Sequence, residues 1–266
     1  TNPIRDLLFF LPKPCLINLR NVATHLYCST KDIDKIIAAS GNTDITAHFN
    51  AYRALAVNGN ICKACGMKEL SAFRAGVPDG EQWRADYDHQ LCRSKYLIPL
   101  CDVCNQDAKK AKDLFRHKNG TDRLAFYPYT EEAKGLIDIV IDNLRDPEPI
   151  IKVNWNTQDV GLLVKLNTWD EVYDIRSRIE GQFRSLEAII EDEINPEDSA
   201  HLVRRIHDEA RSKSLNTLKR KEWAFWYQKL FSQLQQIGID GVEAFWAKQE
   251  FTQNQAEMGA DFILNR

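Results

Sequence analysis

The chain has 266 residues, of which 44% are hydrophobic and 27% are charged, and its formal net charge is −3. This composition is typical of a globular protein large enough to bury one or two cores, and it excludes a chain that is basic throughout. Any contact with nucleic acid must therefore come from a local basic patch. No apolar run approaches the about 20 residues that a transmembrane helix needs, so we expect no membrane association.

Residues 1–57 are predicted to form an N-terminal helical segment. Ser29 or Thr30 is suited to cap an amphipathic turn that starts at residue 32 and ends at Gly41. A second helix is predicted from Ile45 to Val57, because Asn58-Gly59 then ends the pattern.

Residues 58–120 differ in character, because they carry two Cys-x-x-Cys pairs. The first pair is Cys62 and Cys65, and the second is Cys101 and Cys104. Two pairs at this spacing favour a closed tetrahedral Zn²⁺ site made of four thiolates, which leaves no open position for chemistry. We therefore predict structural zinc and a reducing, cytoplasmic compartment.

Between the two pairs lies the doublet Asp88-His89, at the end of a strand predicted from Trp83 to His89. A helix is predicted from Asp102 to His117, with Asn105 in its first turn. A carboxylate beside an imidazole suits metal-assisted hydrolysis of a phosphodiester, because the carboxylate binds a hard cation and the imidazole deprotonates water. The alternative is a hydrogen-bonded surface pair without a chemical role.

In combination, these motifs resemble the HNH nuclease family. The resemblance covers roughly residues 58–120 and rests on Cys62-x-x-Cys65, Asp88-His89, the run from Leu97 to Asn105, and Lys109-Lys110. It implies an HNH endonuclease that hydrolyses phosphodiester bonds, with DNA as the expected substrate. The implied fold class is α+β, with a small zinc-stapled ββα-metal core between the helical N-terminal segment and a mainly α-helical C-terminal domain.

The resemblance also implies a role for each site residue. Asp88 and Asn105 would hold a catalytic Mg²⁺ or Mn²⁺, His89 would be the general base, and the four cysteines would hold zinc away from the reaction. Tyr96 stands where the family usually has an asparagine that orients the histidine. This departure supports an alternative function, a non-catalytic zinc-stabilised module that binds nucleic acid or protein.

Several basic residues near these motifs are candidates for phosphate contacts. Lys109 and Lys112 follow Asn105 by four and seven residues, so one helix would place them on the same face. The alternative is that these lysines lie on a solvent-exposed helix face and bind no phosphate. The full set of candidates is Arg93, Lys95, Lys109, Lys110 and Lys112.

Residues 121–165 are predicted to connect this core to the C-terminal domain, with a helix from Ile137 to Leu144. In residues 166–266, apolar side chains from Leu166 to Ile190 recur at helical spacing, and Asn195-Pro196 ends the run. Further helices are predicted from Pro196 to about Ser212, from Leu218 to Gln236, and from Val242 to Gln253.

A second basic stretch, from Arg204 to Lys221, precedes the aromatic residues Trp223, Trp226 and Tyr227. Interleaved cations and aromatic rings can bind nucleic acid. These rings share one side of a helix, however, which favours a place in the core. We expect the C-terminal domain to recognise DNA, or to contact a protein partner or a second copy of the chain. Such an extension suits a nuclease of restriction or anti-phage defence.

Overall fold

A computed structural model describes residues 55, 58–71, 74, 76–78, 86–87, 99–110, 112–114, 116–126, 131–144, 149–238 and 240–247. Except for residue 55, the two predicted N-terminal helices lie outside these residues. So do five residues with predicted roles in or beside the site, which are Asp88, His89, Arg93, Lys95 and Tyr96.

Helices and short antiparallel sheets make up the described part of the chain, so the predicted α+β class is confirmed at this level. None of the helices in the described ranges has the length and apolar character needed to span a membrane. In chain order the elements are β1 (Asp86–Tyr87), β2 (Pro99–Leu100), η3 (Val103–Lys109), η4 (Lys134–Leu136), β3 (Ile137–Asp142), β4 (Ile150–Trp155), α5 (Val160–Tyr173), α6 (Ile175–Phe183), α7 (Leu186–Ile194), α8 (Ser199–Ala210), α9 (Leu215–Leu218) and α10 (Ala224–Ile237).

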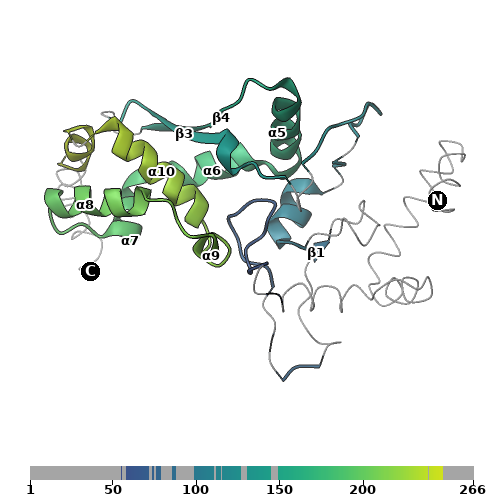
Figure 1. The fold of residues 1–266 in the computed structure, drawn as a ribbon, viewed down its shortest axis with the longest axis horizontal. Coiled ribbons are helices and arrows are strands. Elements are labelled where there is room, and N and C mark those ends of the chain that lie inside the picture. Colours follow the sequence, from purple (N-terminus) through teal and green to yellow (C-terminus); the bar gives the residue numbers. More distant parts are fainter. Residues whose placement is uncertain are drawn as a thin grey trace, which may run out of the picture.

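The hairpin β3–β4 occupies the segment in which a helix was predicted from Ile137 to Leu144, so that prediction is wrong. In β3 the side chains are alternately buried and half-buried, as expected for a strand with one face on a core. Its antiparallel register runs from Ile137 opposite Trp155 to Asp142 opposite Ile150. Helix α10 packs on β3 and α6 packs on β4 (Figure 1). The buried side chains of both strands share one face of the hairpin, and the other face is more exposed.

The predicted helical run from Leu166 to Ile190 is divided into α5, α6 and α7. Asp174 adopts a left-handed conformation with φ 53°, which separates α5 from α6. Asn195, with φ 48°, ends α7 where the Asn-Pro signal predicted an end. Helix α8 confirms the helix predicted after Pro196. It is capped by Asp198, whose carboxylate accepts a hydrogen bond of 2.6 Å from the His201 N–H.

One continuous core extends from the cysteine pairs through the hairpin β3–β4 to α10. Trp226 and Phe231 of α10 are almost fully buried in it. Trp223 and Tyr227 are partly buried and pack against the same core. The prediction that these aromatic residues serve packing is therefore confirmed.

The helix predicted from Asp102 to His117 is shorter than expected. Element η3 is a π-helix that ends at Lys109, because Lys110 adopts a positive φ of 49° and its N–H bonds back to the Asn105 carbonyl. Beyond this point Arg116 forms an isolated antiparallel bridge with Asp122. A π-helix has weaker packing of its own backbone than an α-helix, and short pieces of it are frequent at functional sites.

Candidate metal centre

The four cysteines of the two Cys-x-x-Cys pairs meet in the interior of the protein. The sulfurs of Cys62 and Cys104 are 3.9 Å apart, as are those of Cys65 and Cys101. All four sulfurs lie within 4.8 Å of one another, and all four side chains are buried, free thiols. A zinc ion with four sulfurs at about 2.3 Å in a tetrahedron separates the sulfurs by about 3.8 Å, so this cluster could bind a metal such as zinc.

The first pair lies on a tight loop, and each of its two sulfurs accepts a hydrogen bond from a backbone N–H group. Gly66, with φ +66°, donates its N–H to the Cys62 carbonyl at 2.8 Å. The Met67 N–H points at the Cys65 sulfur and the Cys101 N–H at the Cys62 sulfur, each at 3.4 Å. Such N–H donors spread the negative charge of thiolates, which favours metal ligation.

The second pair is positioned by the hairpin β1–β2 and by η3. Pro99 pairs with Tyr87 and Leu100 with Asp86, so β2 delivers the chain directly to Cys101. Cys104 then lies in the first turn of η3 and is fully buried. A strand and a helix therefore fix one cysteine each.

Two tryptophans of the C-terminal helices hold the backbone of the first pair. Trp169 of α5 donates its indole N–H to the Ala64 carbonyl at 2.6 Å, and Trp226 of α10 donates to the Cys65 carbonyl at 2.7 Å. The two indole rings stack with centroids 6.4 Å apart and an interplanar angle of 15°. The loop that carries Cys62 and Cys65 is thus fastened to helices more than 100 residues away in the sequence.

Hydrogen bonds among the four thiols divide them into two groups, because they raise the pKa of Cys62 and Cys104 and lower the pKa of Cys65 and Cys101. The pKa of the Cys65 thiol is well below its ordinary value, first because the Cys101 thiol hydrogen-bonds to it. Arg178 of α6 donates from Nη1 to the Cys104 sulfur at 3.3 Å. Burial of Arg178 disfavours its charge, but the charges of Cys104 and Cys65 and the hydrogen bonds to them together outweigh burial and raise the pKa of Arg178.

The predicted catalytic residues are only partly within the described residues. Asn105 is half-buried in the first turn of η3, one residue after Cys104, and its N–H donates to the Cys101 carbonyl at 3.1 Å. Strand β1 ends at Tyr87, next to the doublet in the sequence. Asp88 and His89 themselves lie outside the described residues, so their approach to Asn105 stays a prediction.

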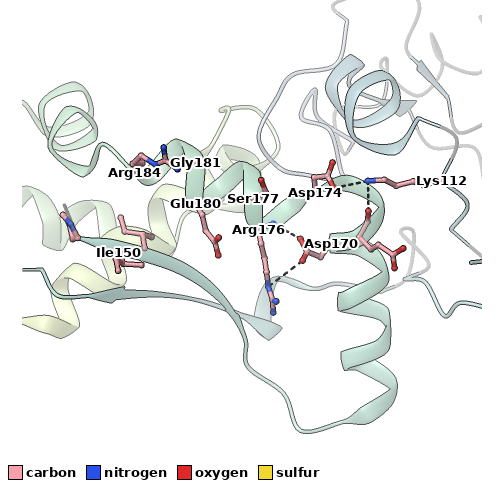
Figure 2. A pocket seen from close by; sticks show the side chains of 12 residues that line it. Lys112, Ile150, Asp170, Asp174, Arg176, Ser177, Glu180, Gly181 and Arg184 are labelled. Atoms are coloured by element: carbon pink, nitrogen blue, oxygen red, sulfur yellow. Dashed lines mark hydrogen bonds and ion pairs between the residues drawn. The ribbon is translucent and has the colours of Figure 1, made fainter.

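The predicted phosphate-binding lysines have different environments. Lys109 is fully buried, whereas Lys110 is exposed. Lys112 lies beyond the end of η3, so the prediction that it shares the helix face of Asn105 is wrong. Its ammonium donates to the Glu171 carbonyl at 2.8 Å and to the Asp174 carboxylate at 3.0 Å (Figure 2).

An open pocket of about 810 Å³ lies where α5 meets α6, beside Lys112. Figure 2 shows that its lining carries both signs of charge, and the pairs Lys112–Asp174 and Arg176–Asp170 lie across it. None of the four cysteines lines this pocket. Because much of its charge is compensated internally, we assign it no ligand.

Sequence reasoning missed Trp169 and Arg178 as partners of the metal centre. Both contacts join residues far apart in the chain, so no local spacing signals them. Comparison of the chain with protein-family models, with curated proteins and with solved structures found no match.

Proposed function

We propose that the protein is a metal-dependent endonuclease of the HNH type that hydrolyses phosphodiester bonds in DNA. The observation that carries this proposal is the order of elements around the cysteine cluster. Strand β1 ends immediately before Asp88-His89, β2 pairs with it and leads into Cys101, and η3 begins with Asn105 in its first turn. A hairpin followed by a helix, closed by four cysteines, is the arrangement that the HNH resemblance implies.

In this proposal the two metal sites have separate tasks. Zinc at the four cysteines holds the corner between β2 and η3, so that Asn105 has a fixed position. A divalent Mg²⁺ or Mn²⁺ held by Asp88 and Asn105 would supply Lewis-acid stabilisation of charge on the scissile phosphate. His89 would take the proton from the water that attacks the phosphorus.

Lys110, at the C-terminal end of η3, is exposed and is therefore better suited to a phosphate contact than Lys109. Arg93 and Lys95, which follow the doublet in the sequence, are the other candidates. The buried Lys109 is better suited to a structural role. These contacts would neutralise backbone charge without reading base sequence. A role in restriction or anti-phage defence is part of the same proposal.

The test is the nicking of supercoiled plasmid by zinc-loaded protein with Mg²⁺ or Mn²⁺. The variants His89→Ala and Asn105→Ala remove the base and a metal ligand, and each is expected to lower the rate about 10²- to 10⁴-fold. His207→Ala is the matched control, since this exposed histidine on α8 lies outside the proposed site. Full activity in His89→Ala would contradict the assigned base.

A second candidate function is a zinc-stabilised module that binds nucleic acid or protein without cleaving it. The burial of Lys109 and the ion pair of Lys112 favour the protein-binding form of this module, because one predicted phosphate contact is buried and the other is paired with Asp174. Such a module would bind DNA or a protein equally well without Mg²⁺. Zinc-loaded, folded protein that binds DNA but never nicks it, with either divalent ion, would support this function over the nuclease.

A further inference from the structure

We propose that Arg178 is an outer-sphere partner of the metal centre, through which α6 raises the affinity of the four cysteines for metal. The inference rests on the zinc site of the proposed function and is independent of the nuclease reaction. Arg178 donates from the same nitrogen, Nη1, to the Cys104 sulfur and to the Tyr173 carbonyl, each at 3.3 Å. The guanidinium is therefore held between a metal ligand and the end of α5.

The position of Arg178 follows from the break between α5 and α6. Asp174 is left-handed, and its carbonyl accepts the Arg178 N–H at 3.1 Å in the first turn of α6. This turn directs the side chain back toward the last residue of α5, whose carbonyl it caps. Helix α5 also packs on η3, which carries Cys104. Helices α5 and α6 therefore fix the position of the Arg178 guanidinium.

The charge of the metal centre explains why a cation belongs there. Zn²⁺ with four thiolates carries a net charge of −2. Cys62 and Cys104 are fully buried, so water does little to offset this charge. The N–H groups of Met67 and Cys101 supply dipoles to two other sulfurs, and Arg178 supplies a full positive charge to the Cys104 sulfur. Hydrogen bonds from a charged donor are about twice as strong as neutral ones.

A reciprocal effect on the helices follows from the same contact. If α6 favours metal binding, then bound metal must favour the docked position of α6 to the same extent. Trp169 strengthens this link, because it joins α5 to the Ala64 carbonyl between the first two cysteines. Metal at the cysteines thereby stabilises the corner formed by α5 and α6.

The experiment measures zinc affinity of the full-length protein by competition with a chromophoric chelator. Arg178→Gln keeps a hydrogen-bond donor but removes the charge, and it is expected to lower the affinity about 10- to 100-fold, the usual effect of losing an outer-sphere partner. Arg178→Lys keeps the charge and should restore most of the affinity. The control is Arg184→Gln, because Arg184 is an exposed arginine that follows the last residue of the same helix.

Cobalt substitution separates a role at the sulfur from a general loss of stability. The thiolate-to-Co²⁺ charge-transfer band should shift in Arg178→Gln and stay unchanged in Arg184→Gln. An affinity within about twofold of wild type in Arg178→Gln, or an equal loss in Arg184→Gln, would overturn the proposal. If Arg178→Gln fails to fold, hydrogen exchange of the wild type decides instead. Chelation must then lower protection in α5 and α6, and unchanged protection overturns the inference.

The outcomes also distinguish this proposal from the proposed function. Wild-type protein that binds neither Zn²⁺ nor Co²⁺ would overturn the metal centre and Arg178 together. Wild-type protein that binds zinc in the Arg178-dependent manner but never nicks DNA would support the outer-sphere role and contradict the nuclease.

Discussion

Two regions of the molecule reach stability by different means. The cysteine region, residues 58–71 and 99–110, contains one two-residue strand and a short π-helix. Its buried side chains include the four cysteines, Lys109 and five apolar residues, namely Ile61, Met67, Leu70, Leu100 and Ala108. The helical region, residues 160–247, buries large side chains that include Phe183, Trp226 and Phe231.

The difference between the two regions indicates what a bound metal would contribute to the stability of the cysteine region. A segment as small as the cysteine region buries little apolar surface of its own, and a metal ion bound at the proposed centre would supply part of the free energy that orders its backbone. The helical region instead has the apolar burial that usually drives folding. The two meet where Trp169, Trp226 and Arg178 reach the cysteine loop.

Metal removal should have the largest effect and should separate the two regions. Structural zinc binds with an apparent free energy of about 10–16 kcal/mol, which the cysteine region loses on chelation. We expect its amides to lose protection from hydrogen exchange, while those of α8 and α10 retain most of theirs. Loss of protection in α8 and α10 at the same chelator concentration would contradict the distinction between the regions.

Phe231→Ala should destabilise the helical region and leave the metal site unchanged. Phe231 is fully buried in α10, so truncation is expected to destabilise the protein by about 3–5 kcal/mol. Chemical denaturation measures this change, and zinc stoichiometry of the folded fraction should stay the same. Leu215→Ala is the control, because Leu215 is 58% exposed and its loss should cost less than about 0.5 kcal/mol. An equal effect of the two variants would be inconsistent with the described core.

Trp226→Phe tests the junction between the regions. It keeps most of the apolar surface but leaves the buried Cys65 carbonyl without its donor, which is expected to cost about 1–3 kcal/mol. Trp155→Phe is the matched control, since its indole N–H bonds Asn167 at an exposed site. Thermal unfolding of the zinc-loaded proteins should show the larger loss for Trp226→Phe, and the reverse order would contradict this junction.

Lys221→Met should have the smallest effect, within the helical region. Its ammonium pairs with Glu193 at 2.9 Å on the surface, a contact worth about 0.2–1 kcal/mol after solvent screening. The hydrogen bond to Glu193 raises the pKa of Lys221. The pair therefore stabilises the protein below the ordinary lysine pKa of about 10.4, and this contribution is lost as the pH rises through the raised pKa.

Urea unfolding of wild type and Lys221→Met at neutral and strongly alkaline pH measures this dependence. The difference in unfolding free energy should disappear at the alkaline end. A difference that is constant with pH would show that Lys221 acts through packing of its aliphatic chain instead.

The sequence predicted those features that depend on local spacing. The two Cys-x-x-Cys pairs predicted the cluster, and Asn195-Pro196 predicted the end of α7 and a following helix, which is α8. The prediction of a helix at β3 was wrong, although Ile137, Ile139 and Ile141 recur at the strand period of two, with Asp138 and the apolar Val140 between them. The alternation was visible, and it was outweighed by the apolar character of the segment.

Other features depend on contacts between distant segments. Lys109 is fully buried, and no local pattern in a lysine-rich stretch signals this burial. Arg178 lies 74 residues after Cys104, so its role could not be read from spacing. The break at Asp174, which positions Arg178, also needed the tertiary structure, because aspartate in the left-handed region carries no strong sequence signal.

The most direct test of the account is native mass spectrometry of the purified protein beside Cys104→Ser. The account predicts one zinc ion bound to each wild-type chain and none to the variant under the same conditions. A folded wild-type chain without metal, or zinc retained in full by Cys104→Ser, would contradict the claim that these four cysteines form the metal centre of the protein.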